Sequence, residues 1–426
     1  MRLRILSHYY PPEVGAPQTR LAALAAGLSR RGVEVTVHTG FPHYPDGEIK
    51  APHRNRPLRI GREDGVRVMR SWVYAAPNRG FGRRLANHAS LSASALAAAP
   101  AGGPADVLLV ETPPLLLAGA AVAYARAKRA RLVLNVADLW PDSAVEMGTL
   151  SSPRAIAAAR LVERRAYRAA AAIACPTEGI HTTLRERPES AGKAALMRPA
   201  VDLLRFVGSI GPTKSAAANG RGDGQPLRVL YAGTVGLAHG LGTLLDAAEE
   251  LERRAAAGAF GVPAAGGEGV TARAAALAVT IAGDGADAAA LRARLADGGP
   301  AGVRMLGGVA AERIPSLYEQ SDVAVVVLRD LPIFEGALPT KLLEAMAAAR
   351  PVVLAARGEA ARLVEAERCG LVVPPEDPRA LAAALAALAA DPGRRAELGA
   401  AGRRCAEREF GREAWLQRWH ELLASA

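Results

Sequence analysis

The first 40 residues alternate between two patterns of hydrophobic and polar positions. Residues 3–7, LRILS, have the short apolar pattern of a buried strand, and a turn-rich loop, YYPPEVGAPQT, follows them. The next stretch, RLAALAAGLSRRG, repeats apolar residues at helical spacing and ends at Gly32, after which VEVTVHTG is again a strand pattern. This order predicts one β–α–β unit.

Further strand patterns continue the alternation in the amino-terminal half. Residues 105–111, ADVLLVE, and 131–138, RLVLNVAD, are apolar runs separated by helical segments. Strands that alternate with helices are typical of a parallel, doubly wound sheet. We therefore expect the amino-terminal half to be an α/β domain.

The second half repeats the pattern of the first. Residues 208–225 form a polar run without an apolar period, which predicts a linker. Strand and helix patterns resume at LRVLYAGTVG, and WLQRWHELL near the end predicts a terminal helix. The predicted organisation is an amino-terminal Rossmann-like domain over residues 1–207, a linker over 208–226, a second Rossmann-like domain over 227–409, and a helix over 410–426 that packs back on the first domain.

Length and composition agree with two globular domains. A chain of 426 residues is too long for one ordinary core, and half of its residues are hydrophobic. Cys175, Cys369 and Cys405 are odd in number and lack metal-ligand spacing, so we expect buried free thiols in a reducing compartment. The first residues lack a signal-peptide core, and the apolar stretch around 115–125 is too short to span a membrane. These features predict a cytoplasmic protein, at most peripheral at the inner face of the plasma membrane.

The charge balance suits an anionic partner without choosing among the possibilities. The net charge is +11 and the isoelectric point is near 10.0, which fits a nucleotide diphosphate, an anionic lipid surface or nucleic acid, and equally an arginine-rich drift in composition. Between Arg54 and Arg84 arginines are interleaved with Trp72, Tyr74 and Phe81, a mixture that suits a membrane interface. Only 4% of residues are aromatic and no nucleic-acid-binding signature is present, so no nucleic-acid partner is expected.

Glycines between a predicted strand and helix form the first candidate for an anion site. In YAGTVGLAHG, Gly233 and Gly236 would let backbone amides approach a phosphate at a helix start. Turn glycines also follow strands in α/β proteins that bind no phosphate there. The spacing is not G-x-G-x-x-G, which disfavours a nicotinamide dinucleotide.

A sharper candidate is the segment LPTKLLEAMAAARPVVLA, residues 338–355. Pro339 and Thr340 predict a helix start whose free amides would receive a diphosphate, with Lys341 as a mobile cation. Lys341 is the only lysine after Lys214 in an arginine-rich chain, although a solvated lysine at a helix end is an equally good interpretation. Glu344, one turn further, would accept hydrogen bonds from a ribose diol or form a surface ion pair with Lys341.

Six segments in this order resemble a family 4 glycosyltransferase of the GT-B fold. They are SHYYPPEVGAPQTR, NVADLWPDSA, YAGTVG, AGDG, RMLGGV and LPTKLLEAMAAARPVV. The likeness runs over nearly the whole chain. The chain is particularly similar to the branch that makes O-antigen and capsule sugars, including fucosamine and colanic-acid transferases. It implies two Rossmann-like domains with parallel sheets facing a cleft, the first for the acceptor and the second for the donor.

The resemblance also implies a reaction. We expect a retaining hexosyltransferase that moves an N-acetylated or deoxy hexose from a nucleotide diphosphate donor to a lipid-linked or saccharide acceptor in cell-surface polysaccharide synthesis. The family likeness favours UDP as the nucleotide. The nucleotide sugar is a co-substrate, and neither a metal nor another cofactor is expected. The rival readings are a nucleotide-sugar epimerase or hydrolase on the same fold and a catalytically inactive binding module.

The resemblance assigns roles residue by residue. The expected catalytic residues are Asp138, Glu335 and Lys341, with a helix-capping role as the alternative for Asp138. Glu13 and Arg20 would face the cleft on the acceptor side. The expected donor-binding residues are Gly15, Gly233, Thr234, Gly236, His239, Gly283, Leu338, Pro339, Thr340, Lys341 and Glu344.

Three departures from the family pattern bear on these assignments. The family often carries two glutamates separated by seven residues, but here Gly336 occupies the first place and Glu335 lies one residue early. Thr234 and His239 stand where many relatives have an arginine and a lysine. The segment from Pro199 to Asp202 replaces the usual Asn-Gly-Val-Asp. Neutralisation of the phosphates would then depend on Lys341, on backbone amides or on an arginine that the sequence does not single out.

Overall fold

The computed structural model describes residues 1–13, 15–44, 47–49, 51, 53–54, 56–76, 81–146, 148–209, 226–236, 238–256 and 277–426. The chain forms two units, the first comprising Met1–Arg198 with Trp415–Ala426 and the second Pro199–Ala414. Residues 210–225 of the predicted linker lie outside the described residues, as does Arg79 of the basic segment. In the part of the chain that the structure describes, no helix is long and apolar enough to cross a membrane.

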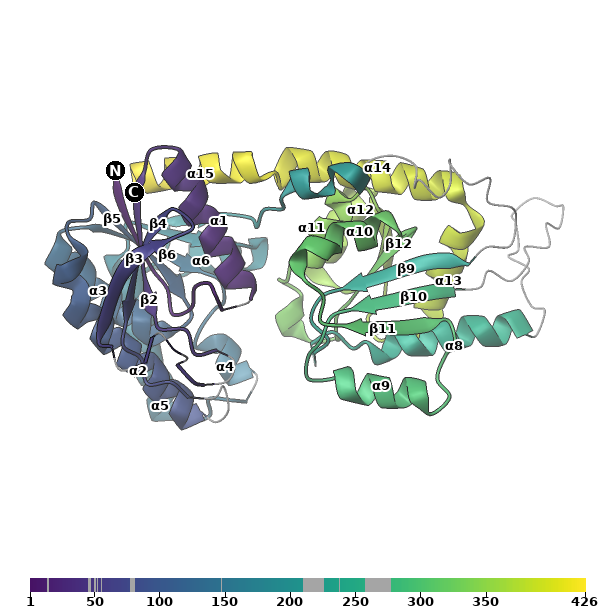
Figure 1. Ribbon diagram of the computed structural model, residues 1–426, viewed down its shortest axis with the longest axis horizontal. Coiled ribbons are helices and arrows are strands. Elements are labelled where there is room, and N and C mark those ends of the chain that lie inside the picture. The colour runs from purple at the N-terminus through teal and green to yellow at the C-terminus, as the bar shows by residue number, and fades with distance from the viewer. Residues whose placement is uncertain are drawn as a thin grey trace. The chain divides into compact units, whose positions relative to one another are not determined.

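An eight-stranded sheet forms the centre of the described first unit (Figure 1). Its strand order is β3-β4-β2-β1-β5-β6-β7-β8, and every neighbouring pair is parallel except β3 and β4. The strands are β1 (Arg2–Leu6), β2 (Glu34–Gly40), β3 (Leu58–Glu63), β4 (Val66–Ser71), β5 (Val107–Thr112), β6 (Arg131–Val136), β7 (Ala172–Cys175) and β8 (Ala194–Leu196). The helices are α1 (Ala16–Arg30), α2 (Phe81–Ala98), η1 (Ala99–Gly102), α3 (Leu115–Lys128), α4 (Asp142–Glu146), α5 (Pro153–Ala169), α6 (Glu178–Glu186) and, at the end of the chain, α15 (Arg412–Ser425).

The antiparallel pair β3–β4 lies inside the basic segment and is an addition to the predicted pattern. Asp64 and Gly65 form its two-residue turn with φ angles of 47° and 81°. An Asp-Gly pair between two short strands favours this turn, because both residues tolerate positive φ. The sequence signal for a hairpin was therefore present at the edge of the predicted sheet.

A six-stranded parallel sheet forms the centre of the described second unit. Its order is β11-β10-β9-β12-β13-β14, formed by β9 (Leu227–Ala232), β10 (Leu277–Ala282), β11 (Val303–Gly307), β12 (Val323–Val327), β13 (Val352–Ala355) and β14 (Gly370–Val373). The helices are η2 (Leu203–Ser209), α8 (Gly242–Ala256), α9 (Ala288–Ala296), η3 (Ala311–Arg313), α10 (Ile314–Glu319), η4 (Pro332–Phe334), α11 (Thr340–Ala347), α12 (Gly358–Ala366), α13 (Pro378–Ala390) and α14 (Pro392–Glu409).

The second sheet is covered on both faces. Along β9, Val229 and Tyr231 belong to a core with α8 and α13, whereas Leu230 belongs to a core with α11, α12 and α14. Side chains of successive strand residues point to opposite faces, so a continuous apolar strand indicates burial on both sides. This confirms the predicted α/β fold class with two parallel-sheet domains.

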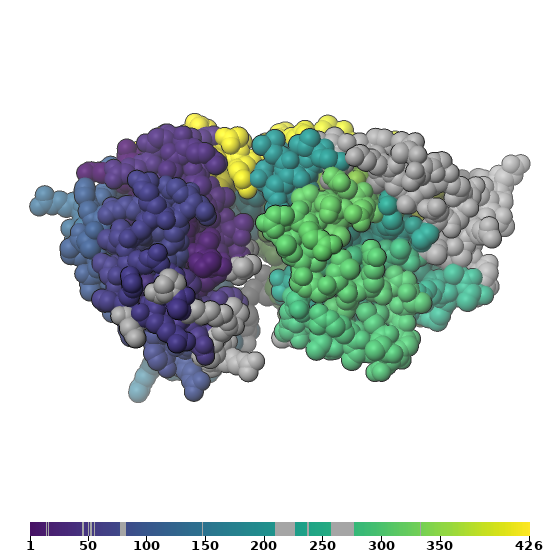
Figure 2. Space-filling model, in the orientation of Figure 1, coloured from purple at the N-terminus to yellow at the C-terminus, as the bar shows by residue number. Residues whose placement is uncertain are grey.

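The end of α15 belongs to the first unit. Leu416 lies so close to Gly27 of α1 that a Cβ on Gly27 would be 2.4 Å from a leucine methyl carbon. The side chain of Arg31 donates to Gln417 at 3.0 Å. Trp415 and Trp419 are 2% exposed. Figures 1 and 2 show the yellow end of the chain beside the purple residues of this unit.

The cysteine prediction is confirmed at the level of burial. Cys175, Cys369 and Cys405 are all buried, and none of them forms a disulfide among the described residues. Burial raises the pKa of both Cys369 and Cys405 to about 12, so these two thiols stay protonated and unreactive near neutral pH.

Candidate functional site

In the second unit, the loops that follow β9 and β10 touch backbone to backbone. Gly233 and Gly283 have φ angles of 147° and 154°, which L-residues with a side chain rarely adopt. A Cβ on Gly283 would lie 1.8 Å from the Gly233 carbonyl oxygen, and the Gly233 amide donates to Ala282 at 2.9 Å. Both glycines are therefore required for this close approach at the carboxyl edge of the sheet.

The helix start predicted in the segment 338–355 is confirmed. Helix α11 begins at Thr340 with Pro339 as its N-cap, and no side chain caps its first amides. Thr340 is exposed, while Leu338 and Pro339 are half-buried. The first amides of an uncapped helix need acceptors, and a phosphate oxygen is a suitable one.

Lys341, in the first turn of α11, points back toward the glycine loop. Its ammonium donates to the Tyr231 hydroxyl at 2.6 Å and lies 4.2 Å from the centre of that ring. The Tyr231 hydroxyl in turn donates to the Thr234 carbonyl at 2.6 Å. A Cβ on Gly233 would be 3.0 Å from Lys341 Cε, so the lysine chain runs along the loop that Gly233 begins.

Lys341 is 8% exposed. Within the described residues, no carboxylate lies at ion-pair distance from its ammonium. Burial lowers the pKa of Lys341 to about 7, and the charge of Glu344 acts weakly in the opposite direction. An anion placed beside this ammonium would stabilise its charged form.

Glu344 lies one turn beyond Lys341. The sequence allowed an ion pair between these two side chains, but their charged atoms do not lie within 4 Å of each other. Its carboxyl group is half-buried, and burial raises its pKa against the opposing charges of Arg205 and Lys341. The ribose-binding role of Glu344 stays a prediction.

His239 packs edge-to-face with the Tyr231 ring. The two ring centres are 6.2 Å apart, and the His239 amide donates to Gly236 at 2.9 Å. Burial, together with the nearby charge of Lys341, lowers the pKa of His239 to about 4. Its buried Nδ1 has no hydrogen-bond partner among the described atoms, so at neutral pH a neutral imidazole adjoins the glycine loop.

Glu335 lies at the end of η4 and is exposed. Its carbonyl accepts from the Glu359 amide at 2.6 Å, and a Cβ on Gly358 would be 1.9 Å from that oxygen. The backbone of Glu335 is thus fixed while its carboxylate faces solvent. Its catalytic role stays a prediction.

In the first unit, Arg20 of α1 forms a partly buried ion pair. Its guanidinium contacts the carboxylate of Glu111, and the Asn135 amide donates to the other Glu111 oxygen at 2.6 Å. Glu111 and Asn135 lie near the carboxyl ends of β5 and β6 and are 5% and 4% exposed. Burial raises the pKa of Glu111, and Arg20 and Asn135 oppose that shift. Arg20 therefore has an internal partner, and its acceptor role stays a prediction.

Glu13 is also engaged inside the first unit. One carboxylate oxygen accepts from the backbone amides of His43 and Tyr44 at 3.0 and 2.9 Å, and the other from the Tyr10 amide at 3.4 Å. These bonds hold the loop after β1 against the loop after β2. Gly15 is the N-cap of α1 with extended backbone, and its carbonyl accepts from Thr19.

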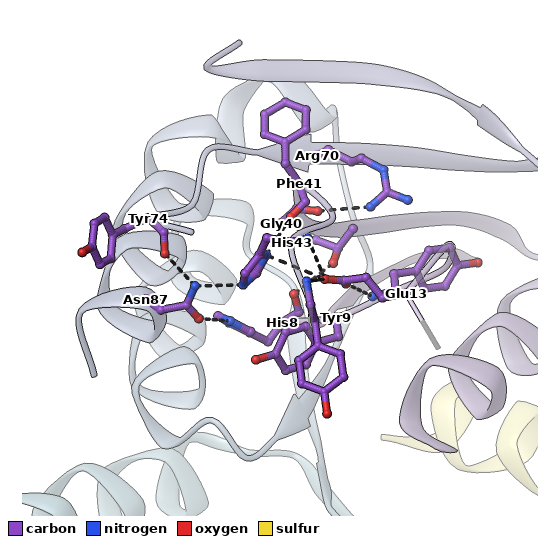
Figure 3. A network of polar contacts seen from close by, with 12 residues as sticks. His8, Tyr9, Glu13, Gly40, Phe41, His43, Arg70, Tyr74 and Asn87 are labelled. Carbon is purple, nitrogen blue, oxygen red and sulfur yellow. Dashed lines mark hydrogen bonds and ion pairs between the residues drawn. The ribbon is translucent and has the colours of Figure 1, made fainter. Parts of the chain in front are cut away.

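A polar network that sequence reasoning missed adjoins Glu13 (Figure 3). The Asn87 amide nitrogen donates to the Tyr74 carbonyl at 2.7 Å, which fixes the orientation of the amide. That nitrogen also lies 2.9 Å from His43 Nε2, and the Asn87 oxygen lies 2.6 Å from His8 Nε2. His8 Nε2 must therefore carry the proton, which leaves His8 Nδ1 as a buried acceptor without a partner among the described atoms.

Asp138 follows β6 and is half-buried. Its carboxylate accepts from the Ser143 hydroxyl at 2.9 Å, and its carbonyl accepts from the Trp140 amide at 3.0 Å. Ser143 lies in the first turn of α4. Asp138 therefore contacts this short helix through the Ser143 side chain and not through the free backbone amides of the helix. The catalytic role of Asp138 stays a prediction.

Two family models match adjacent parts of the chain. Residues 15–200 match a model described as "Glycosyl transferase 4-like domain", and residues 226–391 match one described as "Glycosyl transferases group 1". Together they leave unmatched only the first 14 residues, the segment 201–225 and the carboxyl-terminal end. The chain is a glycosyltransferase.

Solved structures identify the fold of this glycosyltransferase as GT-B. Sucrose-phosphate synthase (tll1590) from Thermosynechococcus elongatus is 19% identical with a TM-score of 0.69 and full coverage of both chains. Anabaena Alr3699/HepE in complex with UDP is 17% identical with a TM-score of 0.69 and full coverage of both chains. WaaG, a glycosyltransferase involved in lipopolysaccharide biosynthesis, is 14% identical with a TM-score of 0.65 over 99% of this chain and 100% of its own. At these identities the likeness concerns the fold.

The search of curated proteins found no match. Both family models agree with the resemblance to a family 4 glycosyltransferase, whereas membership of the O-antigen and capsule branch stays a prediction. Sequence reasoning located Lys341 of this glycosyltransferase but missed Tyr231, its hydrogen-bond partner. The available signal was a tyrosine at the penultimate position of a mostly aliphatic strand, two residues before Gly233.

Proposed function

We propose that this glycosyltransferase moves a hexose, N-acetylated or deoxygenated, from a UDP-linked donor to a lipid-linked or saccharide acceptor in the synthesis of a cell-surface polysaccharide. Transfer retains the anomeric configuration and needs no metal. The observation that carries the donor assignment is the buried Lys341 side chain at the start of α11, whose ammonium has no carboxylate partner in the part of the chain that the structure describes.

A nucleotide diphosphate fits this part of the second unit in charge and in hydrogen bonding. Its phosphates would accept from the uncapped amides at Thr340 and from Lys341, and Gly233 and Gly283 leave room for a close approach to the backbone. The structure of HepE, which shares the fold, contains UDP. Uridine is proposed on that likeness.

Lys341 and the first amides of α11 also suit the chemistry of the transfer. As the bond from the sugar to the β-phosphate breaks, the sugar becomes oxocarbenium-like and negative charge grows on the leaving diphosphate. Lys341 and the α11 amides would stabilise that charge more strongly in the transition state than in the bound donor. Glu344 would hold the ribose hydroxyls, and Asp138 and Glu335 are the proposed carboxylates near the anomeric carbon.

A donor screen tests this proposal. UDP- and GDP-sugars are added to the purified chain and the melting temperature is measured, because a ligand at 100 times its Kd adds about 2.7 kcal/mol of stability. We expect a rise with UDP-sugars in the presence of a chelator, and its loss in Lys341→Ala and Glu344→Ala. Lys128→Ala, which changes a lysine of the first unit, is the matched control. No rise with any nucleotide would favour an inactive module.

Product analysis separates transfer from the rival activities. A transferase consumes the donor only with an acceptor and forms a new glycoside, whereas an epimerase or hydrolase converts the nucleotide sugar alone. Conversion without an acceptor, at the same rate as with one, would contradict the proposal.

We place the acceptor side at a membrane that carries an isoprenoid-linked saccharide. In the first unit Trp72, Tyr74 and Leu85 are 47%, 44% and 45% exposed, close in sequence to Arg83 and Arg84. Aromatic and basic residues together favour the surface of an anionic bilayer. Sedimentation with anionic and with neutral vesicles tests this placement, and equal release from both would contradict it.

A further inference from the structure

The first unit holds an apolar cavity that the donor chemistry does not use. Its volume is about 260 Å³, and it lies among helices α2, α3 and α5 and the loop that carries Trp140. The lining residues are Arg84, Leu85, His88, Leu115, Leu116, Trp140, Leu150, Ala155, Ala158, Ala159 and Val162.

Small residues on α5 leave this space open. Ala155, Ala158, Ala159 and Val162 recur at i, i+3, i+4 and i+7, the spacing of one helix face. On α3, Gly119 brings the two helices close, since a Cβ there would be 2.9 Å from a Val162 methyl. Three alanines on a face that points at neighbouring helices fill less volume than the larger residues common at such positions. The result is a hollow with an apolar wall.

The polar groups of the cavity suit an anion at its mouth but not a sugar inside it. Arg84 is exposed and is the one charged residue in the lining. Burial and the neighbouring Arg84 charge lower the pKa of His88 to about 4, so its imidazole is neutral at pH 7. A hexose would need several hydrogen-bond partners for its hydroxyls, and these two side chains do not supply them.

We propose that this cavity binds the isoprenoid chain of a lipid-diphosphate-linked acceptor, at the end next to the phosphates, with Arg84 paired to a phosphate. The proposal rests on the proposed function, because it names the lipid of that acceptor. A volume of about 260 Å³ lies just below the range of about 300–1,000 Å³ that is common for ligand pockets. The cavity therefore admits one short apolar segment, and the rest of the chain stays outside.

The neighbouring surface agrees with this occupant. Leu85 both lines the cavity and is 45% exposed, so the apolar wall continues onto the outer face of α2. Tyr74 is joined to the same helix through the bonds from its amide to Ser90 Oγ and from Asn87 to its carbonyl. An apolar ligand that leaves a bilayer would meet exposed aromatic and aliphatic groups before it enters the cavity.

Binding of farnesyl diphosphate to the full chain, measured by calorimetry, tests the proposal. Saturating UDP is present throughout, so that the diphosphate of the probe does not occupy the Lys341 site. Ala158→Phe places a ring on an exposed lining position and should weaken binding about tenfold or more by excluding the chain. Ala157→Phe, on an exposed position of the same helix outside the lining, should bind as the wild type does.

The charge is tested with a second matched pair. Arg84→Gln should bind farnesyl diphosphate only as well as farnesol, while Arg83→Gln, outside the lining, should keep the preference for the diphosphate. Equal affinity of wild type and Ala158→Phe would overturn the proposal. Inorganic pyrophosphate that binds as tightly as farnesyl diphosphate would also overturn it, because the chain would then contribute nothing.

Failure of the proposed donor site can be distinguished from failure of the proposed lipid cavity. If UDP does not bind, the same titrations are carried out in Lys341→Met, which removes the competing cation of the second unit. Loss of farnesyl diphosphate binding in Ala158→Phe on that background would still support the cavity, whereas unchanged binding would overturn it.

Discussion

Each unit holds a cation near the carboxyl ends of its parallel strands, but the two cations have different partners. Arg20 contacts Glu111, which Asn135 also holds at 2.6 Å. Lys341 is held at 2.6 Å by the neutral hydroxyl of Tyr231. A buried charge is tolerated when it is paired, and an unpaired one is costly and shifts its pKa toward the neutral form. We therefore predict that Arg20 stabilises the fold, whereas Lys341 serves the ligand of the proposed function.

The largest expected effect is on the stability of the first unit. Arg20→Met leaves the Glu111 carboxylate buried without its cation, which costs about 3–5 kcal/mol in the free energy of unfolding. Urea denaturation measures this loss. The double variant Arg20→Met, Glu111→Met should recover most of it, and a single variant as stable as the wild type would show that the pair is not structural.

The matching change in the second unit should act on the ligand and not on the fold. Lys341→Met removes a buried ammonium that has no acidic partner among the described residues, so the free energy of unfolding should stay the same or rise. Affinity for a UDP-sugar should fall by about 30- to 150-fold, the equivalent of about 2–3 kcal/mol for a hydrogen bond to a charged group. Unchanged affinity together with lost stability would reverse the comparison.

The pH dependence sharpens the same contrast. The Lys341 pKa is about 7 in the free chain and about 10.4 in an unfolded chain, so between these values the unfolded state binds more protons and stability rises with pH. Donor affinity should move the other way, falling by up to about tenfold per pH unit above pH 7, because the anion binds the ammonium form.

A UDP-sugar is the suitable ligand for this measurement, since its diphosphate is capped by the sugar and has no group that titrates near pH 6. Calorimetry at several pH values, in buffers of different ionisation enthalpy, measures both the affinity and the proton uptake. Lys341→Arg stays charged throughout and should bind with little pH dependence between pH 7 and 9. A wild type with the same flat profile would contradict a titrating Lys341.

The sequence predicted the parts of the fold that depend on local periodicity. Strands β1, β5 and β6 and the start of α11 lie within one or two residues of their predicted positions, because a buried strand and a helix start carry their signals in adjacent residues. The β3–β4 hairpin was not predicted, although the Asp64-Gly65 pair is typical of its turn. Many charged and aromatic residues lie in this segment, and they make the alternation of its strands less clear.

The sequence predicted charged residues of the candidate site but not the partners that they contact. Lys341 stood out as an isolated lysine, yet its partner Tyr231 is 110 positions away, and no spacing rule joins them. The same holds for Arg20 and Glu111, which are 91 positions apart. A contact between different strands and helices is decided by the packing of the sheet. The sequence therefore identified the charged groups without showing which of them have internal partners.

The smallest expected effect concerns the group that holds Lys341. Tyr231→Phe keeps the ring under the ammonium but removes the hydroxyl that accepts from Lys341 and donates to the Thr234 carbonyl. Donor affinity should fall about fivefold, the equivalent of about 1 kcal/mol for one hydrogen bond. Tyr318→Phe is the control, because its hydroxyl donates to the Lys341 carbonyl at 3.2 Å and does not touch the ammonium. We expect that variant to lose stability while it binds the donor as the wild type does. Equal losses of donor affinity in the two variants would show that Tyr231 acts only through packing, and that the ammonium takes its position without the hydroxyl.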